Sequence, residues 1–551
     1  MMKRPVFPFI ALALSAALLT GCTAVSGAGS GAAPSASSES ASSGESTAAT
    51  PAVSTTFTGD LSPTEVLAGN ADYTTVNDDE WAASDAVEVV LSGSSAKTSS
   101  DAVAAADGTI TISAAGVYRL SGTLDGQVVV AAPEDALVVL ILDGVTITNS
   151  AGAAIDVQTA DDVAISLAKG STNAVSDAAS YADDAEANAA IYAAADLTIS
   201  GDGKLQVTAN GNDGITSKDD LVILSGTVTV TAVDDALRGT DALVVEGGTL
   251  ALTATGGDGL KSDQEGDETK GYILVSGGTI DITAGDDGVQ AQTDTVITGG
   301  TLTVAATDDG VKGEVVLSIG GGDITVTESN EAVEAGNIGV FAGTVSLVSS
   351  DDGINASGNS ATTDSQQSGP GGMGGGGMED SGERLEISGG TITVDAEGDG
   401  IDSNGSLRVT GGDITVYGPT RSGNGALDSN GGITVTGGTI IAFSAGGMEE
   451  TPGTESTLGW AMVSAQIAAG QEIELADASG AAVVSATAQK AASSVVIAAA
   501  GITVGESYTL VSGGAGGNEL GTATAGEAAA GMGGGMGGPG GGQPGGFPQA
   551  G

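Results

Sequence analysis

An acidic motif, Asp-Gly followed by an aliphatic residue, recurs along the middle of the 551-residue chain. The motif begins at Asp213, Asp258, Asp287, Asp309, Asp352 and Asp399. Two related turns carry Ala after the acid and begin at Asp235 and Glu331. An extra acid stands directly before the slot at Asp234, Asp286, Asp308 and Asp351. Carboxylates in this number could bind a hard cation, because calcium takes about six to eight oxygen ligands in flexible geometry.

Each Asp-Gly pair is also a favoured turn, because glycine accepts positive φ and aspartate can hydrogen-bond its own backbone. We therefore expect these pairs to form the corners of a repeated structure. Carboxylates in one column would lie about 4.8 Å apart. Neighbouring charges would then repel by roughly 3–4 kcal/mol at an effective dielectric constant of about 20, and by less than about 1 kcal/mol in water. Such a column needs bound cations, basic neighbours or exposure to water.

Calcium is the cation that suits this donor set, and solvated corner acids are the alternative. The expected calcium ligands are Asp213, Asp234, Asp235, Asp258, Asp286, Asp287, Asp308, Asp309, Asp351, Asp352, Asp399 and Asp402. Arg238, Lys261 and Lys312 follow the acidic slot by three residues and offer ion pairs. Lys261 and Lys312 are also candidate bases for a calcium-assisted lyase, but neighbouring acids raise the pKa of a lysine and weaken it as a base.

The composition excludes several other kinds of site. The chain has no His and a single Cys, which rules out a Ser-His-Asp triad, a His-ligated zinc site and an internal disulfide. Its formal net charge of −55 repels nucleic acids and anionic membrane surfaces. The remaining chemistry rests on carboxylates, hydroxyls and a few Lys or Arg.

The elements that must position the acids form a repeat with an underlying step of 22 residues. Gly-Gly-Thr or a close variant marks each step, with its second glycine at Gly226, Gly248, Gly278, Gly300, Gly322, Gly343, Gly390, Gly412 and Gly438. Aliphatic residues then alternate with Thr or Asp, which is typical of a half-buried strand. Such strands bury a core only when stacked, so the sequence predicts an all-β fold, a parallel β-solenoid. A β-propeller, whose blades need about twice this period, is the runner-up.

The two ends of the chain differ from the repeat in composition. Residues 1–21 precede Cys22 in the motif Leu-Thr-Gly-Cys, which resembles a bacterial lipobox. We expect a signal peptide, lipidation of Cys22 and anchoring on the outer side of a bacterial cell membrane. Residues 22–60 would be a flexible tether and residues 61–450 the β-solenoid. The Gly/Met-rich insert at 364–380 and the tail at 513–551 are expected to be disordered.

Several phrases within the repeat resemble a known bacterial family. They include 120–124 (LSGTL), 142–149 (LDGVTITN) and 212–221 (NDGITSKDDL), with the later Asp-Asp-Gly and Gly-Gly-Thr turns. Proteins of this family are called carbohydrate-binding domain-containing proteins. They are extracellular right-handed parallel β-helices, similar in shape to pectate lyases and associated with calcium and acidic plant-wall polysaccharide.

The resemblance covers about residues 85–512 and implies a small C-terminal β segment over 451–512. Ala236, Ala332 and Glu331 depart from the motif, which puts a metal ion in their turns in doubt.

The resemblance implies a surface-anchored monomer that binds an acidic polysaccharide of the pectin or polygalacturonate type through calcium. Such a protein contacts the membrane only through its lipid anchor and binds no nucleic acid. Two alternatives stay open, a calcium-assisted polysaccharide lyase and a structural surface protein or adhesin. Neutral sugars usually bind on aromatic platforms, and the candidates are Tyr192, Tyr272, Tyr417 and Trp460. Packing is the favoured role for all four.

Overall fold

The computed structural model describes residues 57–182, 184–358, 380–514 and 516–528. Within them, regular structure is almost entirely β, and a short helix, α1 (Pro63–Gly69), and a 3-10 turn, η1 (Ala83–Asp85), come first. Neither helix is long and apolar enough to cross a membrane. The predicted signal peptide, Cys22 and nearly all of the predicted tether and Gly/Met insert lie outside the described residues.

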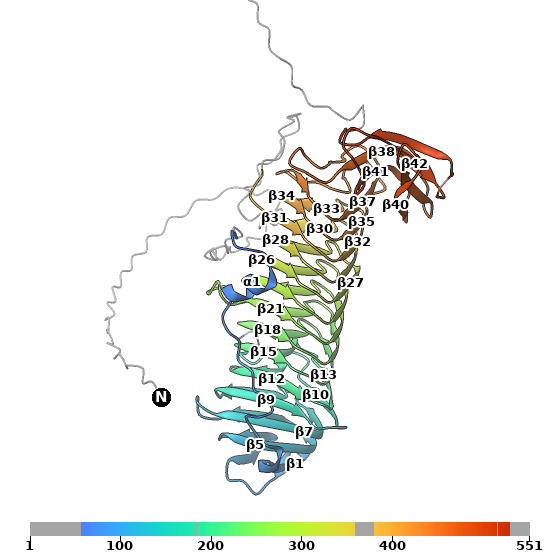
Figure 1. The fold of residues 1–551 in the computed structure, drawn as a ribbon. Coiled ribbons are helices and arrows are strands. Elements are labelled where there is room, and N and C mark those ends of the chain that lie inside the picture. The colour runs from blue at the N-terminus through green and yellow to red at the C-terminus, as the bar shows by residue number, and fades with distance from the viewer. Residues whose placement is uncertain (1–56, 183, 359–379, 515, 529–551) are drawn as a thin grey trace, which may run out of the picture. The chain divides into compact units, whose positions relative to one another are not determined.

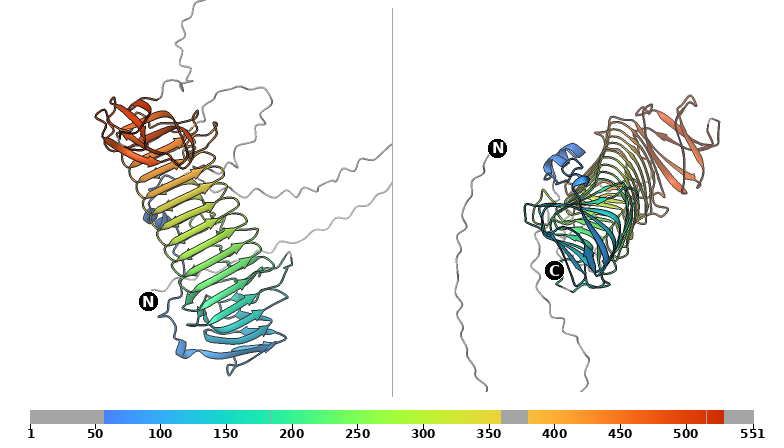
Figure 2. Two further views of the ribbon diagram at one scale, coloured as in Figure 1. Left: turned by 90° about the vertical axis from the view of Figure 1, so that its right-hand side faces the viewer. Right: turned by 90° about the horizontal axis from the view of Figure 1, so that it is seen from below.

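Most strands belong to one long sheet in which parallel pairing dominates, and they form three columns (Figure 1). In the regular part each strand pairs with the strand three places later, so that three consecutive strands make one coil. The register repeats with the sequence period: Thr227 pairs with Thr249, and Thr279 with Thr301. Figure 2 shows the strands of successive coils lying side by side. This arrangement is consistent with the predicted β-solenoid.

The first column contains β4 (Thr109–Ile112), β6 (Gln127–Ala131), β8 (Ile155–Thr159), β11 (Ala189–Ala193), β14 (Asp213–Ser217), β17 (Leu237–Gly239), β20 (Leu260–Ser262), β23 (Val289–Ala291), the starts of β26 (Val311–Ile319) and β28 (Val333–Val340), β30 (Ile354–Ala356) and β33 (Ile401–Ser403). The second column contains β9 (Asp162–Leu167), β12 (Asp196–Gly201), β15 (Asp220–Ile223), β18 (Ala242–Val245), β21 (Tyr272–Val275), β24 (Asp294–Ile297), the ends of β26 and β28, β31 (Arg384–Ile387), β34 (Ser406–Val409) and β36 (Ile433–Val435). The third column contains β10 (Thr172–Ser176), β13 (Lys204–Thr208), β16 (Thr227–Ala232), β19 (Thr249–Ala254), β22 (Thr279–Ala284), β25 (Thr301–Ala305), β27 (Asp323–Glu328), β29 (Thr344–Ser349), β32 (Thr391–Ala396), β35 (Asp413–Tyr417) and β37 (Thr439–Ser444).

At the N-terminal end, β5 (Gly116–Asp125) and β7 (Leu137–Thr148) each span the second and third columns, and hairpin strands close the stack. These strands are β1 (Val87–Gly93), β2 (Ser95–Lys97) and β3 (Val103–Ala106). At the C-terminal end, β38 (Trp460–Ile467) and β41 (Ala492–Ala498) pair antiparallel to each other, and β41 pairs antiparallel to β37. A separate sheet contains β40 (Ala482–Thr487), β39 (Glu472–Ala476), β42 (Ser507–Ser512) and β43 (Glu519–Thr524).

Two predicted boundaries need correction. The predicted solenoid begins at residue 61, but the stacked strands begin with β1 at Val87, and helix α1 lies in the preceding segment. The predicted disordered tail begins at residue 513, but β43 continues the C-terminal sheet beyond it by pairing antiparallel with β42. The Gly-rich composition around residue 513 concealed this strand. It is stabilised by pairing with β42 in the same small sheet.

The core is almost entirely aliphatic and runs through the middle of the stack. In the third column, β16 buries Val228 and Val230 and exposes the threonines between them, as period-two alternation requires. Several strands of the second column bury every residue instead, as β15 and β18 do. Both of their faces must therefore be covered.

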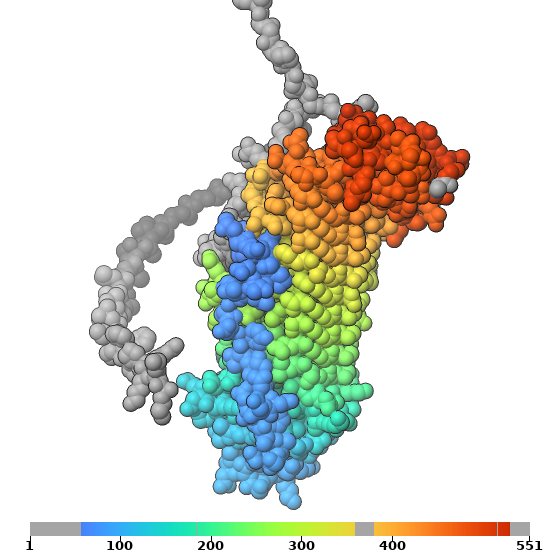
Figure 3. All heavy atoms as spheres, viewed as in Figure 1, coloured from blue at the N-terminus to red at the C-terminus, as the bar shows by residue number. Residues whose placement is uncertain are grey.

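The cover on the outer face of the second column is the N-terminal strap, residues 57–86 (Figure 3). Leu61 and Val66 of the strap pack with Val244, Val296 and other outward-facing residues of the second column. The strap is also hydrogen-bonded along its length. For example, the Ser318 hydroxyl donates to the Leu61 carbonyl, and the Tyr272 hydroxyl donates to the Ala71 carbonyl.

The glycines of the two motifs serve different purposes. The second glycine of Gly-Gly-Thr has a positive φ, for example 86° at Gly300, which L-residues adopt only with strain. The glycine of Asp-Gly is outside that region, so the predicted turn with positive φ is wrong at this slot. Space is the reason: a Cβ built at Gly288 would lie 2.2 Å from Val304 Cγ1 and 2.4 Å from the Gly310 carbonyl oxygen.

This crowding predicts that Gly288→Ala lowers the free energy of unfolding by about 1–3 kcal/mol, because the added methyl group overpacks the corner. Ala332→Gly is the matched control, since the chain itself places Ala in this slot there. It should cost about 0.5–1 kcal/mol through backbone entropy alone. Urea unfolding of both variants measures the difference. Equal losses would show that crowding at the Asp-Gly slot is unimportant.

Candidate functional site

The acids of the repeated motif form one row along the edge of the first column. We call this row the acid ladder. It consists of Asp213, Asp235, Asp258, Asp287, Asp309, Glu331, Asp352 and Asp399. Backbone hydrogen bonds connect the rungs of successive coils, as from Gly288 N to the Asp309 carbonyl and from Gly310 N to the Glu331 carbonyl. Most of the carboxylates are buried: Asp213 exposes 0% of its surface and Asp258 only 1%.

Carboxylates of the ladder accept hydrogen bonds from the backbone of the next coil. Oδ1 of Asp235 accepts from the Asp258 amide at 2.9 Å, and Oδ1 of Asp258 accepts from the Asp287 amide at 2.9 Å. Oδ1 of Asp287 accepts from the Asp309 amide at 2.8 Å, and the same contact joins Asp352 to the Asp399 amide. Each such aspartate therefore connects two coils, and its second oxygen stays available for another partner.

Burial raises the pKa of most ladder acids above the usual 3.8 of aspartate. The pKa rises to about 7 for Asp235 and Asp287, and to about 6 for Asp213, Asp352 and Asp399. Backbone hydrogen bonds and nearby Lys or Arg oppose the shift without cancelling it.

A second row of polar side chains lies beside the ladder, three residues further along each coil. It places Arg238, Lys261, Gln290, Lys312 and Glu334 in register on successive strands. Lys261 Nζ lies 2.7 Å from Asp258 Oδ2 and 3.5 Å from Asp235 Oδ1. Lys312 Nζ lies 2.7 Å from both Asp309 Oδ2 and Glu334 Oε2. These contacts raise the pKa of both lysines, so they keep their protons and serve as counter-charges.

The extra acids before the slot occupy a further row at the surface. Backbone hydrogen bonds place Asp286 and Asp308 in consecutive coils. The corresponding residue after Asp351 is Gly398, whose backbone lies directly over the acids: a Cβ there would be 2.4 Å from Asp351 Oδ1. Gly257 lies in the same way over Asp234. Among the described coils, two neighbouring extra acids therefore occur at Asp286 and Asp308.

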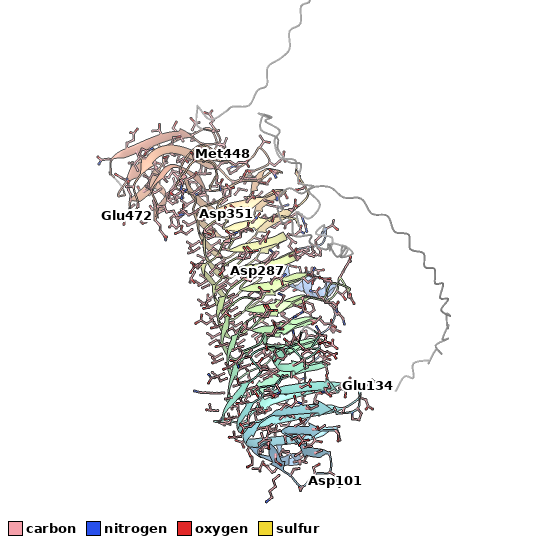
Figure 4. All side chains as sticks on the ribbon, turned by 180° about the vertical axis from the view of Figure 1, so that it is seen from behind. Asp101, Glu134, Asp287, Asp351, Met448 and Glu472 are labelled. Carbon is pink, nitrogen blue, oxygen red and sulfur yellow. The ribbon has the colours of Figure 1, made fainter. Side chains whose placement is uncertain are left out.

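The structure brings some of the predicted calcium ligands together. Two groups of three offer one oxygen each within 4.8 Å of one another, and they are Asp213, Asp234 and Asp235, and Asp286, Asp287 and Asp308. A third such group joins Asp309 to Glu331 and Glu334. The other predicted ligands, Asp258, Asp351, Asp352, Asp399 and Asp402, are in no group of three within the described residues. Asp351 lies further along the same stack as Asp287 (Figure 4).

The three groups differ in how far nearby Lys or Arg side chains neutralise their negative charge. Arg238 Nη1 lies 3.6 Å from Asp213, and Lys261 approaches Asp235. Lys312 bridges Asp309 and Glu334. No Lys or Arg among the described residues forms an ion pair with any member of the Asp286, Asp287 and Asp308 group, which we call the acid trio. Of these three groups the acid trio is thus the least neutralised, and its two outer members are exposed.

Sequence reasoning missed two features. Glu334 joins a group only through its register with Lys312, which the motif spacing alone does not reveal. A fourth group, Asp196, Asp219 and Asp220, lies beside the N-terminal strap, whose Thr74 amide donates to Asp220 Oδ2 at 2.8 Å. A signal for it exists, because Asp196 and Asp220 each begin a strand of the second column.

All four candidate aromatic platforms are buried packing residues, as the sequence predicts. Tyr272 is covered by the strap, to which its hydroxyl donates. Tyr417 stacks on Phe443 with ring centroids 5.6 Å apart. Trp460 packs in the core at the C-terminal end of the stack. Tyr192 packs with Ala153 and Ala189, and its hydroxyl has no hydrogen-bond partner among the described residues.

The ladder geometry predicts different outcomes for two substitutions of Asp287. Asp287→Ala removes the acceptor of the buried Asp309 amide and should lower the free energy of unfolding by about 1–3 kcal/mol. Asp287→Asn keeps an oxygen in that place and should cost much less. Urea unfolding at neutral pH with chelator compares the two. If Asn costs as much as Ala, the carboxylate has a role other than that of amide acceptor.

The raised pKa values predict that the metal-free protein loses stability as the pH rises. Each such acid has a higher pKa folded than unfolded, so its contribution is complete below about pH 4 and is lost through about pH 6–7. The free energy of unfolding in chelator should fall from pH 5 to pH 8, by at most about 1.4 kcal/mol per pH unit for each acid. Asp287→Asn should make the fall shallower. Stability that rises over this range would contradict the pKa assignments.

Comparison with known proteins adds to this geometry. A family model for carbohydrate-binding domain-containing proteins matches residues 106–353. A curated relative of that name from Acetivibrio thermocellus is 41% identical over 137 residues, which are 24% of this chain and 48% of the relative, so the match spans about half of the relative's length. A solved structure described as the polysaccharide lyase-like protein from C. thermocellum, in a gadolinium derivative, shares 34% identity. That match covers 44% of this chain and 94% of that one, with a TM-score of 0.37.

The matched residues include the acid ladder from Asp213 to Asp352. They also include the phrases at 120–124, 142–149 and 212–221 that carry the resemblance seen in the sequence. Residues 106–353 of the chain are therefore similar to the family of carbohydrate-binding domain-containing proteins.

Proposed function

We propose that this chain is a surface-anchored, right-handed parallel β-helix that binds an acidic polysaccharide through calcium held at the acid trio. The observation that carries the proposal is the trio itself. Asp286, Asp287 and Asp308 offer converging oxygens within 4.8 Å of one another, and no Lys or Arg of the described residues pairs with them.

The donor set of the acid trio fits calcium. All three ligands are carboxylates, which are hard oxygen donors, and two of them are exposed and can also share a cation with an external ligand. Asp287 Oδ1 accepts from the Asp309 amide, which fixes the carboxylate and leaves Oδ2 for a cation. The mutual charge of Asp258, Asp286 and Asp308 raises the pKa of Asp286 beyond the effect of burial, and a bound cation would relieve that strain.

A cation is also what an acidic polymer needs in order to bind this chain. With a net charge of −55, the protein repels a polyuronate. Calcium at an exposed carboxylate pair keeps open coordination positions, because it takes about six to eight oxygens and the trio supplies few of them. Polymer carboxylates can occupy those positions and become bridged to the protein.

The ion pairs of the two lysines favour a protein that binds the polysaccharide without cleaving it. A lyase removes the proton alpha to a uronate carboxylate and needs a base near neutral pKa. Lys261 and Lys312 are held in ion pairs that raise their pKa, so neither is suited to accept that proton. We propose that they are structural counter-charges, and ultraviolet absorbance of unsaturated products from polygalacturonate tests this.

The proposal predicts that the wild-type protein binds polygalacturonate in millimolar calcium and releases it in chelator. Calcium should also stabilise the fold, by about 2.7 kcal/mol when its concentration is a hundred times the dissociation constant. The double variant Asp286→Asn/Asp308→Asn should lose both effects, because two of the three trio carboxylates lose their charge. Pull-down and thermal unfolding, each with calcium or chelator, provide the measurements.

The matched control is Asp281→Asn/Asp323→Asn, which removes the same charge from two exposed positions on the third column, outside the trio. It should keep calcium binding and polymer binding. If the control variant fails equally, net charge rather than the trio governs binding. If chelator changes neither polymer binding nor melting temperature in the wild type, calcium has no part in the function.

A further inference from the structure

A cavity of about 370 Å³ opens at the first column, N-terminal to the acid ladder. Its lining residues come from β8, from β11 and the residue after it, and from the segment just before β11, and they are Asp156, Gln158, Glu186, Ala187, Tyr192 and Ala194. Tyr192 lies in register with Asp156 on the neighbouring strand. The volume falls within the range of about 300–1,000 Å³ that is usual for small-ligand sites.

The hydroxyl of Tyr192 sets this cavity apart. Only 2% of the residue is exposed, and the hydroxyl is buried without a hydrogen-bond partner among the described residues. The other tyrosines all have one: the hydroxyls of Tyr73, Tyr118, Tyr181, Tyr272, Tyr417 and Tyr508 each donate to a carboxylate or a carbonyl. A buried donor left unpaired costs about 1–3 kcal/mol, so a ligand that supplies the acceptor gains that energy.

The other polar groups of the cavity are mainly acceptors. Asp156 is 9% exposed, and its Oδ2 accepts from the Gln158 side-chain amide at 2.7 Å. Glu186 contributes a second carboxylate. Burial and these two acids raise the pKa of Tyr192 to about 12, so the phenol keeps its proton at neutral pH and remains a donor. The cavity therefore offers the phenol donor, two carboxylate acceptors and the amide of Gln158 to whatever enters it.

Sugar hydroxyl groups match this set, because each can donate to a carboxylate and accept from the phenol. A uronate or phosphate would bring negative charge against two carboxylates, which is unfavourable. A bare metal ion would use the carboxylates but would leave the phenol proton without an acceptor. A neutral polyol is thus the class of ligand that satisfies every group.

The wall that carries Glu186 is an addition to the regular coil. The connection that follows β10 extends to residue 188, whereas the corresponding connection in the next coil, between β13 and β14, needs only residues 209–212. Glu186 and Ala187 of the longer connection line the cavity together with residues of β8 and β11.

We propose that this cavity is a subsite for one neutral sugar residue of a polysaccharide, held by the Tyr192 hydroxyl and the carboxylates of Asp156 and Glu186. The subsite is separate from the acid trio and needs no calcium. It would extend the protein's ligands from acidic polymers to chains that contain neutral residues.

Isothermal titration calorimetry of the full chain in chelator tests the subsite. The probes are neutral tetrasaccharides of gluco, manno, galacto and xylo configuration, with tetragalacturonate as the charged comparison. We expect at least one neutral tetrasaccharide to bind and tetragalacturonate not to bind. Tyr192→Phe removes only the hydroxyl and should weaken neutral binding about three- to tenfold, the value of one neutral hydrogen bond. Its melting temperature should be unchanged or higher, because no protein contact is lost.

Two further variants keep the test decisive. Tyr417→Phe is the matched control: it loses a hydroxyl bonded to the Thr487 carbonyl, outside the cavity, and should bind the neutral probe like wild type. Glu186→Gln should weaken neutral binding and strengthen tetragalacturonate binding, because one repelling charge disappears.

The proposal is overturned if no neutral tetrasaccharide binds at millimolar concentration, or if Tyr192→Phe and Glu186→Gln bind like wild type. The two proposals fail separately. Loss of calcium-dependent polygalacturonate binding with retained neutral binding would remove the proposed function and leave this subsite. The reverse result would remove the subsite alone.

Discussion

A carboxylate buried in a sheet must be given hydrogen-bond donors or positive charge, and the rest of the first column depends on how this requirement is met. The backbone of the next coil supplies the donor: Asp235 accepts from the amide of Asp258, and Asp258 from that of Asp287. Each aspartate thereby fixes the register between two coils as well as the corner of its own. The same contact helps acids to be packed densely here, since each of these carboxylates forms a bridging hydrogen bond to the next coil.

Backbone donors satisfy one oxygen of a carboxylate and do not cancel its charge. Neutralisation by a positive charge is therefore a separate need, and the extent to which it is met varies along the stack. Lys261 and Lys312 neutralise the ladder on either side of Asp287, and the register that aligns them places the uncharged Gln290 between them. The coil of Asp287 therefore lacks a base of its own, and its extra acid, Asp286, is followed by a second extra acid, Asp308, in the next coil. The missing base and the two neighbouring extra acids occur together at the acid trio. Calcium is therefore proposed at the trio and not along the whole ladder.

Local pattern predicted stacked strands, because alternation and the Gly-Gly-Thr step are properties of each strand alone. Features that depend on contacts with a neighbouring coil could not be predicted from the sequence. The φ at Gly288 is ordinary, and glycine is needed because Val304 of the next coil lies against it. The Ser62-Pro63 start of α1 is a readable helix signal, but the surface on which it docks consists of strands that look fully buried from sequence. Tyr192 was correctly identified as a packed aromatic, and only the structure shows its hydroxyl without a partner.

The outer faces of the stack are not equivalent, and this restricts where a polymer can lie. The strap covers much of the second column, and strands such as β16 on the third column present mostly threonine. The first column carries the charged and hydrogen-bonding groups, and both the Tyr192 cavity and the acid trio belong to it. Four strand steps separate Tyr192 from Gln290, the register partner beside the trio. At about 4.8 Å per step, this is about 19 Å along the stack. A polysaccharide that follows the column could therefore place a neutral residue at one end and a calcium-bridged acidic residue at the other.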